Sequence, residues 1–489
     1  MQIAHNSETP IEEGMLIGGK RVNSADKIEI FNPARPDDLV GTVVRGTTDH
    51  VDAAVRSAKS AQPTWAAMTY VQRAAALRRA LSHLENDIDR RATVFVRENG
   101  KPLAQARGDL LSVPKRQKLA LDYASQLDAG REFAAVSGRT FTLNRPYGVV
   151  VSIVPWNAPD VLAFTQIVAA LLAGNCVVLK PPESCPLTLI RSVTMFAAEL
   201  PPGVINIVTG LPAEIGDALT KHPDVGKIGF TGSIPSARHI MANAAETIKG
   251  VTLELGGNDP AIILDDASFD APTIKRITSA VFHMTGQVCM AIKRVYVPAK
   301  RRDEFLDAFV RSTDAIVVGD GLEPGVTMGP LHTRKAQLRA QGLLNDATDR
   351  GAQVNSRGRI DNDATFETGY FMQPTIVTDL PDDAALMIEE QFCPAIPVTT
   401  YEDLDEAIAR ANQTHFGLSG SVWSQNIDRA LKIAARIEAG HVWVNNHGPH
   451  AINHLAPYGG MKQSGIGRKS GIEGILEYVQ SQTITTLES

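Results

Sequence analysis

The chain has 489 residues, with 48 Lys and Arg against 54 Asp and Glu, which makes its formal net charge −6. At roughly 150 residues a domain, this length predicts two to four domains with large buried cores. The sequence has no basic block, which argues against a nucleic-acid partner, and no uncharged apolar run of the ~18 residues that a transmembrane helix needs.

The N-terminal part is predicted to be a leader of short strands followed by helices. Residues 1–47 carry a Gly-Gly-Lys turn at 18–20 with a short strand on either side. Apolar residues at helical spacing predict three helical regions, at 49–61, 70–98 and 103–127. Pro114 should kink or break the third of these regions. Residues 133–145 are polar and β-prone, which favours an extended arm.

A regular alternation of strands and helices follows the arm. Strands are predicted at 149–154, 176–179, 204–208, 227–230 and 251–255. Helices are predicted between or after them, at 161–173, 188–200, 214–219 and 236–247. This alternation is typical of a Rossmann-like parallel sheet covered on both faces. Such sheets bind ligands at the carboxyl ends of their strands.

A second α/β unit follows, and the chain ends in a β-prone tail. Its strands are predicted at 294–297, 315–318, 374–377, 396–400, 418–423 and 441–445. Its helices are predicted at 302–313, 333–349, 404–412 and 429–439. Residues 481–486 favour an exposed strand. The sequence shows no short-period repeat.

Cysteine usage indicates a reducing compartment. The chain has four cysteines, and none lies in a Cys-x-x-Cys pair, so neither a zinc site nor a disulfide framework is expected. The N-terminus has no basic region followed by an apolar core, so no signal peptide is expected. We therefore expect a cytoplasmic protein without a metal.

Cys289 is the residue on which the functional interpretation depends. It lies three residues after Gly286 and just before a predicted strand, so a turn can present its thiol. Taken alone, a cysteine is more often a small, inert, buried residue.

Polar residues at the ends of the predicted parallel strands favour a nucleophilic role for Cys289 over an inert one. Asn157 follows the first strand, Lys180 and Glu183 follow the second, Ser233 follows the fourth, and Glu254 closes the fifth. All should meet in one crevice. With Cys289 they supply a thiol nucleophile, an amide donor, a carboxylate base and a helix N-terminus.

In their order along the chain, these segments resemble the NAD(P)-dependent aldehyde dehydrogenase superfamily. The resemblance rests on Pro-Trp-Asn at 155–157, Lys-Pro-Pro-Glu at 180–183, Phe-Thr-Gly-Ser at 230–233 and Glu-Leu-Gly-Gly at 254–257. It continues with Gln-Val-Cys at 287–289, Glu-Gln-Phe at 390–392 and the Pro-Tyr-Gly-Gly segment from 457 to 465. It implies a Rossmann-like cofactor domain, a second α/β catalytic domain and a β oligomerisation arm.

The resemblance implies a catalytic role for three residues. Cys289 would attack the aldehyde carbonyl as thiolate and form a thiohemiacetal. The Asn157 amide and the Cys289 backbone N–H would stabilise the oxyanion. Hydride transfer to a nicotinamide would leave a thioester, which a water activated by Glu254 would hydrolyse. Taken singly, Asn157 also suits a turn, and Glu254 also suits an exposed strand end.

The resemblance also assigns cofactor contacts. They are Val154, Pro155, Trp156, Lys180, Glu183, Gly229, Thr231, Gly232, Ser233, Gly256, Glu390 and Phe392. A carboxylate at Glu183 would accept hydrogen bonds from ribose hydroxyls and repel a 2′-phosphate, which favours NAD over NADP. Glu183 also suits the first turn of the following helix, where its charge favours the dipole.

The expected substrate pocket is less defined by sequence. Its residues would be Ala158, Leu162, Val288, Met290 and Tyr458, and the small Ala158 suggests a roomy pocket. Three histidines, His447, His450 and His454, cluster before Tyr458. Without Cys or carboxylate companions they favour a loop that lines the pocket over a zinc site.

The chain departs from the family pattern at five positions. Relatives usually have Gly at Ala237 and Cys393, Lys at Asn258 and Asn at Met284, and they often have Lys at Gln166. Gln166 removes a titratable group that can relay protons to Glu254. Cys393 is either a second reactive thiol or a small packed residue, and we favour the packed residue.

The expected organisation follows from the resemblance. Residues 1–127 and 147–253 would form the NAD-binding domain, residues 254–460 the catalytic domain, and residues 128–146 and 461–489 the oligomerisation arm and tail. The arm and tail have no strand partner in their own domain, so a homodimer or homotetramer is expected. Two other hypotheses remain open: an inactive structural relative and a thiol hydrolase that does not use NAD.

Overall fold

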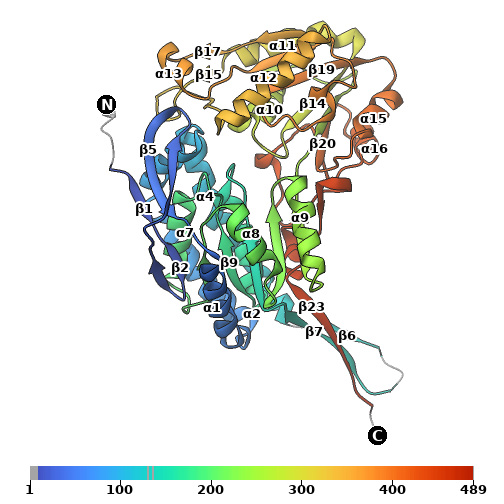
Figure 1. Ribbon diagram of the computed structural model, residues 1–489. Helices are drawn as coiled ribbons and strands as arrows, with labels where there is room; N and C mark the ends of the chain where they lie inside the picture. The colour runs from blue at the N-terminus through green and yellow to red at the C-terminus, as the bar shows by residue number, and fades with distance from the viewer. Residues whose placement is uncertain (1–8, 129–130, 135–136, 488–489) are drawn as a thin grey trace.

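The computed structural model describes residues 9–128, 131–134 and 137–487, which form two α/β domains and a projecting β arm. Figure 1 shows one domain built from the blue to green part of the chain and a second, yellow to orange domain above it. The arm extends from the lower end of the first domain, away from the second. A small sheet of β1 (Ile11–Glu13), β5 (Arg35–Val44) and β4 (Lys27–Asn32) flanks the first domain.

The first domain is organised around an eight-stranded sheet. In sheet order its strands are β22 (Gly465–Ile466), β12 (Gly250–Glu254), β11 (Val225–Thr231), β8 (Val149–Ile153), β9 (Cys176–Lys180), β10 (Ile205–Ile207), β2 (Met15–Ile17) and β3 (Lys20–Val22). The five strands from β12 to β10 are parallel. The apolar runs of β8 and β9 are buried because helices cover them. The predicted parallel sheet is confirmed.

Helices of the first domain pack on this sheet and on one another. They are α1 (Thr48–Ala66), α2 (Tyr70–Ser82), α3 (Ile88–Asn99), α4 (Leu103–Ala120), α5 (Ala124–Asp128), α6 (Pro159–Leu172), α7 (Leu187–Ala197), α8 (Pro212–Lys221) and α9 (Ile234–Ala245). Both α1 and α6 contact β8 and β9. The Trp65 indole ties α1 to the end of α6 by donating to the Leu171 carbonyl at 2.9 Å.

The second domain has a seven-stranded sheet. In order its strands are β16 (Gln353–Ser356), β18 (Thr375–Thr378), β19 (Ala395–Tyr401), β14 (Ile292–Pro298), β13 (Asp259–Ile263), β20 (Ser419–Trp423) and β21 (His441–Val444). Its helices are α10 (Ala271–Phe282), α11 (Arg302–Asp314), α12 (Arg334–Asp349), α13 (Asp363–Thr368), α14 (Ala385–Ile388), α15 (Leu404–Asn412) and α16 (Ile427–Ala434). A short pair, β15 (Val317–Val318) and β17 (Arg359–Ile360), lies beside them. The chain crosses between the two large sheets at residues 255–258, directly after Glu254.

The arm is a separate three-stranded sheet. Its order is β23 (Val479–Thr485), β7 (Thr140–Pro146) and β6 (Arg131–Phe133). The expectation that arm and tail lack a partner needs correction, because β23 pairs with β7 over seven residues from Val479↔Pro146 to Thr485↔Thr140. The two segments are 330 residues apart in sequence but satisfy each other's backbone hydrogen bonds. The two elements that precede β23 in the chain, β22 and α17 (Gly471–Leu476), belong to the first domain.

Two helix predictions differ from the structure. The region 70–98 is not one helix: α2 ends at Ser82, and Asp87 adopts a left-handed φ of 55° before α3 starts. Conversely, α4 runs through Pro114 without ending. Pro114 is buried against the rest of the domain, and this tertiary packing outweighs the lost backbone hydrogen bond.

Six elements of the second domain were not predicted, namely β13, α10, β16, β17, α13 and α14. Strand β13 starts with Asp-Pro directly after a Gly-Gly-Asn stretch, a composition that indicates a turn. It nevertheless lies at the middle of its sheet, between β14 and β20. Helix α10 is capped by Asp270, whose side chain accepts a hydrogen bond from the Thr273 N–H at 2.8 Å. Helix α16 ends at Ala434, five residues before the predicted end.

Candidate active site

A strained turn presents Cys289. Met284, Thr285 and Gly286 are three consecutive residues with left-handed φ values of 51°, 60° and 70°. A Cβ at Gly286 would collide with the Cys393 carbonyl oxygen, so glycine is required there. The Thr285 hydroxyl secures the turn by donating to the Gly329 carbonyl at 2.9 Å. Cys289 follows this turn and precedes β14, which agrees with the predicted presentation.

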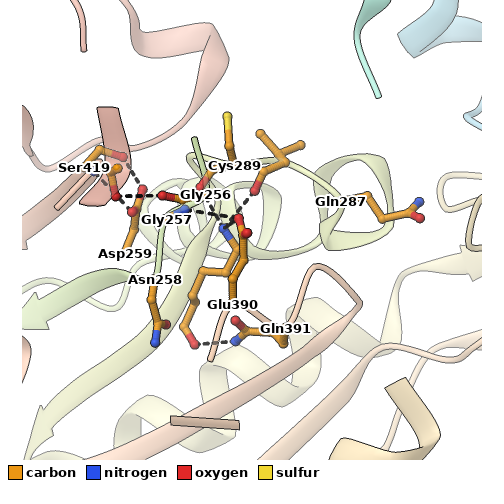
Figure 2. Close-up of polar contacts among 12 residues, drawn as sticks. Gly256, Gly257, Asn258, Asp259, Gln287, Cys289, Glu390, Gln391 and Ser419 are labelled. Atoms are coloured by element: carbon orange, nitrogen blue, oxygen red, sulfur yellow. Dashed lines mark hydrogen bonds and ion pairs between the residues drawn. The ribbon is translucent and has the colours of Figure 1, made fainter. Parts of the chain in front are cut away.

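The loop that carries Cys289 is fixed from below by a buried lysine. The Lys293 ammonium donates to the backbone carbonyls of Cys289 at 2.7 Å and Val288 at 2.9 Å. In Figure 2 the Cys289 sulfur points away from the nearby Gly256 and Glu390. The backbone is therefore held while the sulfur is left free to face the cavity.

Asn157 is positioned by the same loop. It follows β8 and is buried, and its side-chain amide donates to the Gln287 carbonyl at 3.0 Å. Its side-chain oxygen accepts from the Ala158 N–H at 3.0 Å. Its backbone carbonyl accepts from the Lys101 ammonium at 2.9 Å, and Lys101 pairs with Asp109 at 2.6 Å. These contacts hold the amide nitrogen next to the cysteine loop.

Glu254 ends β12 as a buried carboxyl with an unused oxygen. Its side chain is 5% exposed, and its Oε1 accepts no hydrogen bond from any described residue. Burial raises its pKa to about 7, although the cations Lys469 and Arg468 act in the opposite direction. A carboxyl with this pKa can accept and release a proton near neutral pH.

The Cys289 thiol is also influenced by burial. Removal from water raises the pKa of Cys289 to about 12, while the Lys293 ammonium lowers it. Cys289 is half-buried, and its thiol must lose its proton when it attacks a carbonyl, because the thiolate is the nucleophile.

One cavity brings these three residues together with the expected pocket. Asn157, Glu254 and Cys289 line it. All five residues expected to contact substrate line it too: Ala158, Leu162, Val288, Met290 and Tyr458. Thr231, which was expected to contact the cofactor, also lines it. Further lining residues that the sequence analysis did not assign to the site include Asp109, Arg116, Val161, Thr165, His283, Met284, Ile452 and Lys469.

The strand ends of the first sheet lie next to this cavity. The Lys180 ammonium at the end of β9 pairs with the Glu183 carboxylate at 2.7 Å. Ser233 caps α9, with its hydroxyl accepting from the Ser236 N–H at 3.3 Å. The Gly232 N–H donates to the Glu254 carbonyl at 3.1 Å. Thr231 lies beside Glu254 in the register of β11 and β12. These groups can bind the hydroxyls and phosphates of a dinucleotide.

Glu390 lies against the segment that follows β12. Figure 2 shows its carboxylate against Gly256 and Gly257, where Oε1 accepts from the Gly257 N–H at 3.1 Å. The Lys293 ammonium lies 3.7 Å from that oxygen. A Cβ at Gly256 would collide with the Glu390 carboxylate, which explains the glycine. Cys289 and Glu390 thus depend on one lysine.

The aromatic residues expected at the cofactor site form a cluster. Trp156 stacks on His332 with ring centroids 4.1 Å apart, and Phe392 meets Trp156 edge-on at 5.9 Å. Val154 is buried at the end of β8, with Pro155 next to it. Glu390 and Phe392 lie in the loop between α14 and β19. Gly229 lies on β11, where a Cβ would meet the Gln166 side chain.

The five departures from the family pattern are accommodated without disturbing this arrangement. Gln166 donates to the Thr231 hydroxyl at 3.2 Å and accepts from Ser152 at 2.8 Å. Asn258 donates to the Met387 carbonyl at 2.7 Å. Ala237 is buried in α9.

The other two departures are Met284, in the turn before Cys289, and Cys393. Cys393 is buried with its pKa raised to about 12 by burial. That environment favours the packed residue over a second reactive thiol.

Two of the three clustered histidines line the cavity. His450 and His454 belong to the cavity wall. His447 is buried and bonds through its Nδ1 to the Ser421 hydroxyl at 2.8 Å. Within the described ranges, no group of three or more His, Cys, Asp or Glu side chains is arranged to hold a metal ion.

Sequence reasoning missed three buried lysines around the site: Lys101, Lys293 and Lys469. Lys293 could have been noticed, because a charge inside the apolar run from Val288 to Val297 indicates a buried, paired group. Lys101 and Lys469 follow glycine or arginine in ordinary loop sequence, and no local pattern distinguishes them.

The fold and this cavity together define the class of protein, a two-domain α/β enzyme with its reactive groups between the domains. The aldehyde dehydrogenase family model matches residues 21–484. The chain is 33% identical over 482 residues to "Succinate-semialdehyde dehydrogenase [NADP(+)] GabD" of Escherichia coli K12, which covers 97% of this chain and 98% of that protein.

Solved structures agree. An E. coli NADP-dependent enzyme superposes with a TM-score of 0.93 at 32% identity, covering 98% of both chains. An NAD+ complex of an aldehyde dehydrogenase from Bacillus cereus has a TM-score of 0.92 at 34% identity, covering 98% of this chain and 97% of that one. The chain belongs to the aldehyde dehydrogenase family and oxidises aldehydes to carboxylic acids through a covalent cysteine intermediate. No helix among its described residues has the length and apolarity to cross a membrane.

Proposed function

We propose that this enzyme oxidises an aldehyde with NAD and releases a free carboxylic acid, with Cys289 as nucleophile, Asn157 as oxyanion donor and Glu254 as deacylation base. The observation that carries the proposal is the shared cavity, in which a thiol, an amide and a carboxyl of pKa about 7 face the same space. No other residues of the cavity wall combine these three chemistries.

The chemistry of acylation begins at the sulfur. Cys289 loses its proton to solvent, and the sulfur bonds to the aldehyde carbon, so that negative charge develops on the carbonyl oxygen. The Asn157 amide and the Cys289 N–H donate to that oxygen. When bound, the nicotinamide cofactor accepts the hydride that leaves the same carbon, and a thioester remains.

Deacylation uses Glu254. Its carboxylate takes a proton from a water molecule as the water oxygen bonds to the thioester carbon. The carbon–sulfur bond then breaks, its electron pair returns to Cys289, and the acid is released. Because Glu254 supplies a base in the cavity, water rather than coenzyme A is the proposed acceptor.

The groups at the strand ends are suited to a nicotinamide dinucleotide. Lys180 and Glu183 would bind the adenosine ribose, Ser233 at the α9 N-terminus the pyrophosphate, and Glu390 the nicotinamide ribose. The Glu183 carboxylate would repel a 2′-phosphate, which supports NAD. GabD is NADP-dependent by name and the Bacillus cereus enzyme binds NAD+, so relatives use both cofactors.

The cavity wall supports a substrate with an apolar carbon chain. Ala158, Leu162, Val288 and Met290 are apolar and surround the route to Cys289. Arg116 also belongs to the wall. A matched pair of aldehydes, one apolar and one with a terminal carboxylate, therefore tests the assignment. A preference for the carboxylate that disappears in Arg116→Met would contradict it.

We further propose a cytoplasmic homodimer or homotetramer with the domain division 1–127 with 147–253, 254–460, and 128–146 with 461–489. The free cysteines support a reducing compartment. The arm sheet presents strands β23 and β6 at its edges, and sheet edges favour pairing between subunits.

The direct test uses purified enzyme, an aldehyde panel, and NAD or NADP. Formation of the reduced cofactor is followed by absorbance, and the product is identified as acid or thioester. We expect a free acid without coenzyme A and a higher kcat/KM with NAD. Turnover without cofactor reduction would contradict the dehydrogenase, and equal efficiency with both cofactors would contradict the NAD assignment.

A further inference from the structure

Lys469 is a buried lysine, and no carboxylate of the described residues lies within ion-pair distance of its ammonium. Its side chain is 7% exposed, and its ammonium donates to the Thr231 hydroxyl at 2.6 Å. Its backbone is fixed by two hydrogen bonds with Tyr458, each 2.7 Å long. An ammonium held so firmly away from water requires a compensating interaction.

The Glu254 carboxyl in the cavity supplies this compensating interaction. Lys469 and Glu254 both line the cavity, and Thr231, which Lys469 contacts, lies beside Glu254 in the register of β11 and β12. Burial lowers the pKa of Lys469, and the Glu254 carboxylate acts in the opposite direction. Burial raises the pKa of Glu254, and the Lys469 ammonium opposes that increase. The Glu254 Oε1, which accepts no hydrogen bond from a described residue, and the Lys469 ammonium therefore both belong to the wall of this cavity.

Two other side chains lie near this pair. Gln166 on α6 is neutral and donates to the same Thr231 hydroxyl. Arg468 acts on Glu254 too, but its guanidinium is tied to the carbonyls of Gly460 and Gly467. The remaining titratable groups that act on this pair are Cys289 and Tyr458.

We propose that Lys469 is a positioning residue for deacylation, whose ammonium keeps the Glu254 carboxylate ionised and ready to accept a proton from the attacking water. The proposal rests on the proposed role of Glu254. As water loses its proton to Glu254, the oxygen bonds to the thioester carbon and the sulfur leaves. A positive charge beside the base favours its ionised form before this step.

The sign of the expected pH effect follows from the charges. Without the ammonium, the Glu254 pKa rises further, so more of the base is protonated at neutral pH. Activity is then lost at neutral pH and recovered as the pH increases. A shift of one pKa unit corresponds to about a tenfold loss of kcat on the acidic limb of the profile.

The experiment measures kcat and KM against pH for the native enzyme, Lys469→Met and Lys469→Arg, together with the NADH burst. Lys469→Met should shift the acidic limb of the kcat–pH profile to higher pH by about one pH unit. It should keep the NADH burst, because hydride transfer precedes hydrolysis. Lys469→Arg should retain the native limb. If Lys469→Met does not fold, Lys469→Gln keeps a donor for Thr231 and removes only the charge.

Lys227→Met is the matched control. Lys227 is equally buried on β11 of the same sheet, but it lies 3.5 Å from Glu477. Its loss should leave the acidic limb unchanged. The proposal is wrong if Lys469→Met lowers kcat by the same factor at every pH, or if it raises KM alone.

A separate measurement shows whether the role proposed for Glu254 is wrong. If Glu254→Gln turns over normally, the base is misassigned whatever Lys469 does. If Glu254→Gln is impaired, adding Lys469→Met should produce no further pH shift, because the charge acts through the carboxyl. Two independent pH shifts in the double variant would overturn the proposal for Lys469.

Discussion

At Cys289, burial and charge act on one thiol in opposite directions. Burial raises its pKa to about 12, and Lys293 opposes this increase from beneath the loop. Lys293 also contacts Glu390, so one ammonium supports both the nucleophile loop and a proposed cofactor residue. Replacing such a lysine would therefore affect more than one step.

The first prediction concerns the order of defects at the three proposed catalytic residues. Glu254→Gln should reduce steady-state turnover by roughly 10²–10⁴-fold, the usual contribution of a general base, and should keep an NADH burst. Cys289→Ala should abolish burst and turnover, since no thiohemiacetal can form. Asn157→Ala should slow the burst itself by roughly 10²–10³-fold, because one oxyanion donor is lost.

Stopped-flow absorbance of NADH measures these effects, and the buried Cys176→Ala serves as control for loss of a thiol elsewhere. Cys176 lies on β9 in the core, where its pKa is raised to about 12. The hydrolytic mechanism is contradicted if Glu254→Gln retains full turnover, or if the native enzyme turns over only with coenzyme A.

The second prediction concerns cofactor choice. Glu183→Ser removes the carboxylate that would repel a 2′-phosphate and leaves Lys180 without its 2.7 Å partner. The ratio of kcat/KM for NAD to that for NADP should therefore fall, and most of the change should lie in KM. Glu199→Ser, on an exposed part of the same domain, is the control. An unchanged ratio in Glu183→Ser would remove Glu183 from the binding site.

At the scale of elements, a strained turn at residues 284–286 fixes the position of Cys289, the proposed nucleophile. Three left-handed residues in succession are costly, and two of them are not glycine. They persist because Thr285 bonds to the Gly329 carbonyl and Gly286 lies against Cys393. The turn is thus over-determined by contacts with the second domain.

The third prediction tests this turn. Gly286→Ala places a Cβ against the Cys393 carbonyl at a φ of 70°, so it should destabilise the fold by roughly 1–3 kcal/mol and lower kcat as well. Gly342→Ala is the matched control, since Gly342 lies in the exposed face of α12 with no atom near its missing Cβ. It should be neutral or slightly stabilising. Thermal unfolding that ranks the two variants alike would contradict the account.

For the whole molecule, the active site depends on the chain crossing between two sheets. Glu254 ends the first sheet, and the second sheet begins at Asp259. Cys289, Glu390 and Tyr458 come from the second domain or its return segment. Any change in the angle between the domains would move the sulfur relative to Asn157.

The fourth prediction concerns assembly. The arm sheet stands away from the body, and its edge strands β23 and β6 leave backbone groups available for pairing. Sedimentation equilibrium should therefore give at least twice the chain mass of 52.6 kDa at micromolar protein. A mass near that of the single chain across this range would contradict a homodimer or homotetramer.

The sequence by itself determined the elements and the residues that end them. Apolar runs, helical spacing and the polar strand ends located the five parallel strands of the first domain and the residues Asn157, Glu183 and Glu254. The resemblance to the family also located Cys289, the proposed nucleophile. Such features are local, because side-chain period and turn composition act over a few residues.

Tertiary structure alone decided what depends on contacts between distant segments. It carries α4 through Pro114, places β13 at the centre of its sheet, and pairs β23 with β7. It also brings Lys469 beside Thr231 and withdraws Glu254 from water, and that withdrawal is what raises the pKa of Glu254 to about 7. Burial and electrostatic coupling depend on every segment that surrounds a group, so no local pattern in the sequence can specify them.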